Sequence, residues 1–295
     1  MKKIKMKRKQ AIVFIVAFVL ALSVWLYWGN TSIQTTYIDI NSEEISAEFE
    51  GFTIVQVSDL HNAKFGSHQD RLLNAIKEVT PNVIAVTGDL IDSNRTNVAK
   101  AMEFINGAVK IAPVYYVTGN HEARSEQYTK LKQQMIEAGV VILNDEGTTI
   151  KGSGATIQLL GLNDPDFTAT GDTYERIAMN DTKLKSMVSK NNEYTILLSH
   201  RPELFDVYAA NNIDLVLSGH AHGGQVRLPF VGGLVAPNQG FFPKYSEGVY
   251  EKMQTKMVVS RGLGNSIIPL RVNNRPELVI VTLKTPNLNN EHSIQ

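Results

Sequence analysis

The chain has 295 residues, of which 43% are hydrophobic and 20% charged, a composition typical of a folded protein with a sizeable core. Its formal net charge is zero, so no general basic surface is available for nucleic acid, and we expect no nucleic-acid partner. The absence of cysteine excludes disulfides, thiolate metal sites and a cysteine nucleophile, so any metal ion must be held by nitrogen and oxygen atoms.

The N-terminus has the composition of a membrane anchor. Residues 1–10 contain six cations and precede an apolar run over residues 11–28. Eighteen helical residues span about 27 Å, close to the hydrocarbon thickness of a bilayer. Trp25, Tyr27 and Trp28 close the run, where an aromatic belt is expected. The bulky end lacks the small residues of a cleavage site, which favours a transmembrane signal anchor over a cleaved signal peptide.

The distribution of cations predicts the topology of the chain. By the positive-inside rule, residues 1–10 stay in the cytoplasm and the rest of a single-pass cell-membrane protein is extracytoplasmic. Residues 29–50 are polar, and we interpret them as a linker that could end in an edge strand around Ile38 and Ile40. The tail 285–295 is expected to be disordered.

From residue 53 onward, short apolar runs alternate with stretches of helical periodicity. The first three strands are predicted over 53–58, 82–87 and 113–118. Helices are predicted around 72–79 and over 96–109 and 125–138. Later strands are predicted over 139–143, 156–161, 194–199, 213–217, 256–260 and 277–283. This order indicates one α/β domain over 51–284, with a mixed sheet or two packed sheets.

Five of these strands end in loops that are rich in metal-binding side chains. The loops read SDLHN (58–62), GDLID (88–92), GNHE (119–122), SHRP (199–202) and SGHAHGG (218–224). In open α/β sheets, ligands bind at the carboxyl ends of strands, so the five loops should meet in one crevice. Carboxylates and imidazoles crowded there would repel one another or remain unsatisfied without a cation. The pattern therefore predicts a metal site.

The histidines strengthen this interpretation, because five of the seven lie in these loops: His61, His121, His200, His220 and His222. A single histidine at a strand end is more often a hydrogen-bonded structural residue than a ligand. The same placement recurs with Asp59, Asp89 and Asn120, which favours a metal centre. Asp59 and His61 are two residues apart and can face the same way. Asp89 is a single carboxylate that could bridge two ions.

Together, these blocks resemble the calcineurin-like metallophosphoesterase superfamily, whose pattern is D-x-H, G-D, G-N-H-E/D, H and G-H-x-H. All five blocks occur in this order over residues 59–222. The chain is most similar to the bacterial membrane-associated branch of YkuE- and YaeI-like proteins, with relatives that hydrolyse UDP-2,3-diacylglucosamine. That similarity continues into SRGLGNSIIPLRVNNRPELVIVTL and covers nearly all of 52–284. It implies a sandwich of two mixed β-sheets flanked by helices, after an N-terminal transmembrane helix.

The resemblance also implies two divalent metal ions, for which Mn, Fe and Zn are all suitable. One ion would be held by Asp59, His61 and His222, together with a bridging Asp89. The second would be held by Asn120, His200 and His220, again with Asp89. A hydroxide bridging the ions would attack the phosphorus. His121 would lie outside the ligand set, contact the phosphoryl oxygen and protonate the leaving group.

These features predict hydrolysis of a phosphomonoester or phosphodiester substrate. The anchor at residues 11–28 makes a lipid-linked or cell-wall phosphate a candidate. The chain has GDLIDSN where Ser/Thr protein phosphatases have GDxVDRG, which argues against phosphoprotein substrates. The alternatives are a catalytically silent metal-binding scaffold of the same fold and a soluble-nucleotide phosphodiesterase.

Several further residues leave two readings open. Asn62, Arg201 and Arg227 could contact substrate phosphate or form surface salt bridges. Glu122 is more simply explained as structural. The aromatic stretch 232–250 could dip toward lipid or pack on the core.

Overall fold

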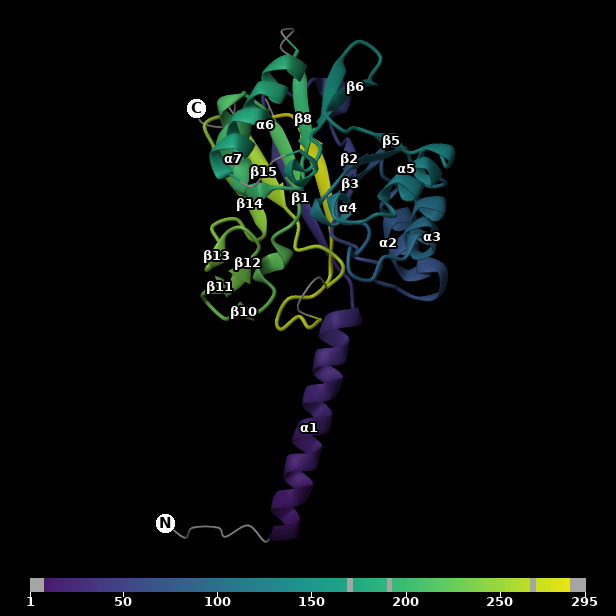
Figure 1. Cartoon of the computed structure of the whole chain (residues 1–295), viewed down its shortest axis with the longest axis vertical. Helices are drawn as coiled ribbons and strands as arrows, with labels where there is room; N and C mark the ends of the chain where they lie inside the picture. The colour runs from purple at the N-terminus through teal and green to yellow at the C-terminus, as the bar shows by residue number, and fades with distance from the viewer. Residues whose placement is uncertain (1–7, 169–171, 190–192, 266–268, 287–295) are drawn as a thin grey trace, which may run out of the picture.

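The computed structural model describes residues 8–168, 172–189, 193–265 and 269–286. A long helix, α1 (Arg8–Thr31), projects from one end of a two-sheet domain (Figure 1). None of its residues is buried, and its length and apolar composition suffice to cross a membrane. The helix contains the predicted apolar span 11–28 and extends three residues beyond it at each end.

The first six-stranded sheet carries three of the five site loops. In spatial order its strands are β1 (Gln34–Asn41), β16 (Glu277–Lys284), β2 (Thr53–Val57), β3 (Val83–Thr87), β4 (Val114–Val117) and β5 (Val141–Ile142). Strands β2 to β5 are parallel, β16 is antiparallel to β2, and β1 is parallel to β16.

The second six-stranded sheet carries the other two site loops. Its order is β14 (Gly248–Lys252), β15 (Thr255–Val259), β9 (Leu215–Ser218), β8 (Tyr194–Leu198), β7 (Thr156–Gly161) and β6 (Glu146–Lys151). The four central strands are parallel, while β14 and β6 are antiparallel edges. Both sheets are therefore mixed, as expected.

Helices cover the outer faces of the two sheets, and an apolar core lies between them. α2 (Asp70–Val79), α3 (Val98–Ala108) and α5 (Tyr128–Glu137) lie over the first sheet, and α6 (Thr173–Met187) and α7 (Phe205–Ala210) over the second (Figure 1). Strand β3 is apolar from Val83 to Val86 because both of its faces are covered. Val83 faces the inter-sheet core, whereas Ile84 packs in the core beneath the helices. A strand buried on both faces needs no polar alternation.

The region expected as a linker over 29–50 is largely structured. Only Ser32 and Ile33 separate α1 from β1, which pairs with β16 along its whole length. Strand β1 covers the edge of β16. Its Ile40 is buried in the inter-sheet core, and Ile38 packs against the same core. The possible edge strand at the end of this region is β1, Gln34–Asn41. Residues 1–7 of the predicted basic segment and 287–295 of the predicted tail lie outside the described residues.

Several short or polar elements were not expected. Besides β6, β14, α6 and α7, these are α4 (Asn120–Ala123) and two small hairpins, β10 (Arg227–Leu228) with β11 (Gly232–Gly233) and β12 (Val235–Ala236) with β13 (Gly240–Phe241). Short 3₁₀ turns cover Ala47–Phe49, Ser67–Gln69, Pro165–Phe167, Pro202–Leu204 and His222–Gly224. The hairpins lie at the end of the domain from which α1 leaves (Figure 1).

Candidate metal centre

The five predicted loops meet between the two sheets, at the carboxyl ends of β2, β3, β4, β8 and β9. Two groups of side chains there place their ligand atoms within 4.8 Å of one another. The first group is Asp59, His61, Asp89 and His222, and the second is Asp89, His200 and His220. Every member is buried, and Asp89 belongs to both groups. This convergence agrees with the crevice predicted from the strand ends.

The two carboxylate oxygens of Asp89 have different partners. Its Oδ2 lies 3.6 Å from Nε2 of His61 and 3.2 Å from Nε2 of His200. Its Oδ1 accepts a hydrogen bond of 2.8 Å from the backbone N–H of His121. One oxygen is thus held by the protein backbone, while the other faces both groups. This geometry suits a carboxylate that bridges two cations.

Asn120, the one predicted ligand without a titratable side chain, also fits a cation. Its Oδ1 is buried and has no hydrogen-bond partner among the described residues. A buried amide oxygen without a partner costs about 1–3 kcal/mol. Asn120 immediately precedes His121, whose backbone N–H contacts Asp89, so its amide belongs to the same loop cluster. The unsatisfied oxygen and the surrounding N and O donors match a hard divalent ion.

The backbone of the centre is strained. Asp59, His61, Asp89, His220 and His222 all have φ between 47° and 67°. This left-handed region costs a non-glycine residue about 1 kcal/mol or more. Such a cost persists only where the surrounding structure determines the conformation, and here it falls on side chains aimed at a common point. The strained backbone therefore indicates a functional site, as the convergence of the donor atoms does.

The carboxylates make the centre strongly attractive to positive charge. Although burial opposes ionisation, the charge of His222 keeps the pKa of Asp59 well below its usual range. Burial lowers the pKa of His200, but the charge of Asp89 outweighs it and raises that pKa to about 10. In the metal-free centre, the proton on His200 supplies positive charge that divalent ions could supply instead.

Hydrogen bonding determines how two of the histidine rings are oriented. Nδ1 of His200 donates to the Thr87 carbonyl over 2.8 Å, so Nε2 is the nitrogen that faces the second ligand group, 3.2 Å from Oδ2 of Asp89. Nδ1 of His121 accepts from the backbone N–H of Ser93 over 2.9 Å. A backbone N–H can only donate, so the proton of a neutral His121 ring resides on Nε2. His121 packs edge-on against His61, with ring centroids 4.4 Å apart, and belongs to neither ligand group.

Glu122, the acidic residue that follows His121, holds two loops of the centre together. Its buried carboxylate accepts from the backbone N–H groups of Asp89 at 2.8 Å, Gly119 at 2.8 Å and Ile91 at 3.1 Å. It therefore joins the loop after β3 to the loop after β4. Burial, followed by the charge of Asp89, raises its pKa to about 7. The structural role expected for Glu122 agrees with these contacts.

Two buried arginines lie behind the paired histidines of the GHAH loop. Arg201 donates to both oxygens of Asp164, at 2.6 and 2.8 Å, and its NH1 lies 3.1 Å from Nε2 of His220. Arg271 has NH2 3.4 Å from Nδ1 of His222. Sequence reasoning placed Arg201 at the surface or on substrate, and it did not single out Arg271 or Asp164. The block SRGLGNSIIPLR was the one signal that could have marked Arg271.

Arg227 and Asn62, the two other possible substrate contacts, differ in their surroundings. Arg227 forms an ion pair with Glu247, in agreement with the salt-bridge alternative. Asn62 donates to the carbonyl of Arg95, and both line a cavity of about 290 Å³ with His61 and Lys100. This cavity opens beside the first ligand group. Asn62 is thus placed where substrate could reach it, whereas Arg227 is not among the residues lining this cavity.

The aromatic stretch 232–250 divides between the two readings. Tyr245 is buried and packs edge-on against Phe205 and Tyr250. Phe241 and Phe242 are 75% and 62% exposed. Part of the stretch therefore belongs to the core, while the hairpin tips present unburied aromatic rings to the surroundings.

Comparison with known proteins agrees with this geometry. The family model of the calcineurin-like phosphoesterases matches residues 52–224. The metallophosphoesterase YkuE of Bacillus subtilis is 31% identical, with 86% of this chain and 87% of YkuE covered. The phosphodiesterase YaeI of Escherichia coli is 26% identical over 79% of this chain and 82% of YaeI. A Danio rerio transmembrane protein with a metallophosphoesterase domain is 27% identical over 84% of this chain and 56% of that protein.

The family match spans more than half of the chain and contains all the predicted ligands. Its residues converge in a buried Asp/His cluster whose geometry suits divalent ions. The chain therefore belongs to the calcineurin-like phosphoesterase family and is a metal-dependent phosphoric ester hydrolase.

Proposed function

We propose that this enzyme hydrolyses a phosphodiester presented at a membrane surface and that α1 is its membrane anchor. The observation that carries the catalytic part is the position of Asp89 Oδ2, which faces His61 and His200 at once. A single oxygen that faces two ligand groups is well placed to bridge two ions. The name of the relative YaeI supports a diester substrate.

The proposed ligand sets follow the two groups. One ion would be held by Asp59, His61, His222 and Asp89, and the other by Asp89, Asn120, His200 and His220. Two divalent ions in these places would activate water at neutral pH and neutralise the phosphoryl oxygens. Mn, Fe and Zn all accept this donor set.

His121 is the proposed proton donor to the leaving group. In the neutral ring Nε2 carries the proton and can hydrogen-bond the leaving oxygen. To transfer a proton the ring must be an imidazolium, whose Nδ1–H would donate to the hydroxyl oxygen of Ser93, 3.1 Å from Nδ1. The ring packs against His61, beside the first ligand group. A positioned imidazole of this kind contributes to the rate by transferring a proton in the transition state. His121 belongs to neither ligand group, so its proposed role is toward the substrate and not toward the ions.

The membrane part of the proposal depends on α1 and on the exposed hairpins. No residue of the helix is buried, and six cations lie within the first ten residues, which favours an extracytoplasmic domain. Phe230 and Phe241, on the hairpins at the same end of the domain, are exposed and would meet the bilayer surface (Figure 1). Arg95 and Lys100 in the cavity beside His61 suit a phosphate group. A lipid-linked phosphodiester is therefore the proposed substrate class.

The decisive experiment measures metal content and turnover on the same sample. The full-length protein in detergent is loaded with Mn²⁺, Fe²⁺ or Zn²⁺, its ions are counted by mass spectrometry, and bis-p-nitrophenyl phosphate is the substrate. We expect two ions and measurable turnover, with turnover lost in Asp89→Asn and retained in His68→Asn, whose side chain is 83% exposed. Two bound ions without turnover under any metal would instead support the silent scaffold.

A further inference from the structure

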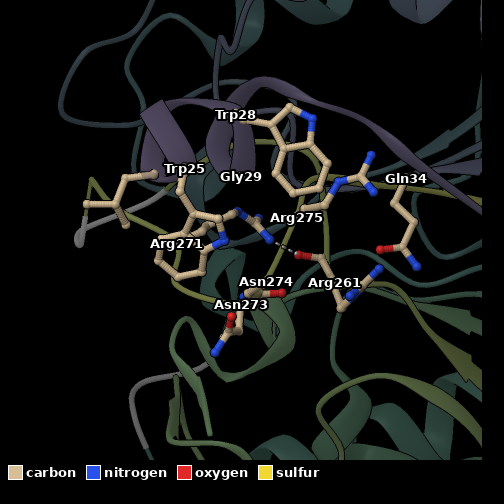
Figure 2. A pocket seen from close by; sticks show the side chains of 10 residues that line it. Trp25, Trp28, Gly29, Gln34, Arg261, Arg271, Asn273, Asn274 and Arg275 are labelled. Carbon is tan, nitrogen blue, oxygen red and sulfur yellow. Dashed lines mark hydrogen bonds between the residues drawn. The ribbon is translucent and has the colours of Figure 1, made fainter. Parts of the chain in front are cut away.

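A second cavity, of about 190 Å³, lies where the end of α1 meets the segments around Arg261 and Arg271 (Figure 2). Trp25, Trp28 and Gly29 of α1 form one wall, and Arg261, Arg271 and Arg275 form the opposite wall. None of these residues belongs to either ligand group of the metal centre. The cavity is therefore a separate feature, built jointly by the anchor helix and the domain.

The walls of the cavity are held together by polar contacts. Asn30 accepts from the backbone N–H of Arg271 at 2.8 Å and donates to the carbonyl of the same residue at 3.0 Å. The guanidinium of Arg275 lies 4.6 Å from the centre of the Trp28 ring. It also donates to the carbonyls of Ser32 at 3.1 Å and Ile33 at 2.8 Å. The cavity is thus preformed by the docking of α1.

The charge of the cavity is positive and incompletely balanced. Arg261 pairs with Glu277 at 3.0 Å and Glu247 at 3.4 Å. Among the described residues, no carboxylate lies within 4.0 Å of Arg271 or Arg275, which donate to neutral oxygens instead. Arg271 is also 1% exposed, so water offers it little compensation. Two guanidiniums without counterions in a lined cavity are suited to an anion.

The position of the cavity along α1 indicates where that anion comes from. Trp25 and Trp28 close the apolar run of the helix, where tryptophans mark the boundary between hydrocarbon and headgroups. With α1 in a bilayer, the cavity lies at the depth of the lipid phosphates. Basic pockets beside membrane helices are suited to anionic headgroups.

We propose that this cavity binds the headgroup phosphate of an anionic phospholipid from the adjacent leaflet. The proposal rests on membrane anchoring by α1, and it does not require the catalytic role proposed above. Because NH2 of Arg271 also lies 3.4 Å from Nδ1 of His222, the bound lipid would lie next to the metal centre without entering it. The indoles supply the apolar contact for the glycerol end of the headgroup.

The chain offers a direct probe, since its two tryptophans both line the cavity. Full-length protein in a neutral detergent is titrated with dihexanoyl phosphatidylglycerol, dihexanoyl phosphatidylcholine or inorganic phosphate, and tryptophan fluorescence is recorded. We expect a saturable change with phosphatidylglycerol, and at the same concentrations no saturation with the other two. An equal response to both lipids would show apolar partitioning, and saturation by inorganic phosphate would show a free-anion site. Either result overturns the proposal.

Variants test the charge of the cavity. Asn273→Asp adds a carboxylate at an exposed lining position whose φ of 51° aspartate tolerates. Arg275→Gln removes one cation. Each should raise the half-saturating phosphatidylglycerol concentration at least about fivefold. Arg71→Gln is the matched control, because Arg71 contacts the end of α1 through the Thr31 carbonyl but does not line the cavity. Unchanged titrations of both cavity variants would refute the site.

Turnover of bis-p-nitrophenyl phosphate on the same preparation separates the two proposals. Active protein that does not respond to phosphatidylglycerol overturns the lipid site alone. Inactive protein that responds as expected overturns the proposed phosphodiesterase activity alone.

Discussion

NH1 of Arg201 lies 3.1 Å from Nε2 of His220, on the side of the ring opposite the Nδ1 that faces His200. The same guanidinium is held at two points by Asp164. A buried ion pair therefore supports the second ligand group from behind. A guanidinium only donates, so Nε2 of His220 accepts this contact, and the ion pair fixes the orientation of the ring.

Removing one partner of this pair should destabilise the fold. Arg201→Gln leaves the buried carboxylate of Asp164 unpaired, a loss of about 3–5 kcal/mol in the free energy of unfolding. Urea unfolding of the metal-free protein measures it. The double variant Arg201→Gln with Asp164→Asn should lose less than the sum of the two single variants. Strictly additive losses would show that the two residues act independently.

Glu122→Gln should loosen the junction between the loops after β3 and β4. A carboxylate accepts all three backbone N–H groups, whereas the amide of glutamine would turn an N–H group toward at least one of them. We expect a loss of about 1–3 kcal/mol in the free energy of unfolding and weaker metal retention during dialysis. Glu126→Gln, in the exposed turn before α5, is the control. Retention equal to that of the control would remove Glu122 from the support of the site.

Removal of metal should lower the melting temperature. At a free-ion concentration of about 100 times Kd, binding of each ion to the folded state alone adds about 2.7 kcal/mol. For a domain of this size that corresponds to about 5–10 °C for each ion, measured by calorimetry with and without a chelator. In Asp89→Ala, which lacks the shared oxygen, the difference should be much smaller. A variant that keeps the full difference would contradict a shared carboxylate.

His121→Asn should slow catalysis while leaving the metal content unchanged. For a phosphodiester with an alkoxide leaving group, the expected loss in kcat is about 10²-fold or more, because the alkoxide needs a proton as it departs. p-Nitrophenolate is a stable anion, so the loss with its ester should be smaller. Comparing the two substrates in stopped assays tests the role. An equal loss with both would indicate that His121 positions the substrate instead.

The buried parts of the fold were predictable from sequence, and the edges were not. Strands such as β3 have both faces covered, so an unbroken apolar run marks them. The edge strand β6 alternates between exposed and half-buried residues, and α6 buries only Asn180 and Leu184. Such elements are determined by their neighbours rather than by their own composition. The edge strand β1 was recognisable only from its alternating isoleucines.

The candidate site shows the same division. The ligand residues were readable because they follow strand ends with recurrent spacing. Asp164 and Arg271, in contrast, lie on irregular segments and reach the site through long-range pairing. For Arg201 the sequence left open a substrate contact or a surface salt bridge, because an arginine beside a predicted ligand gives no sign that it will form a buried ion pair with an aspartate 37 residues earlier. Contacts of this kind depend on the packing of the two sheets.

The brief connection between α1 and β1 has a spatial consequence. Two extended residues span about 7 Å, so Ser32 and Ile33 give the domain almost no slack. With the helix in a bilayer, the catalytic centre stays at a nearly constant height and searches for its targets in two dimensions. Esters carried by neighbouring lipids would be met often, whereas those on molecules held farther from the surface would lie beyond its reach.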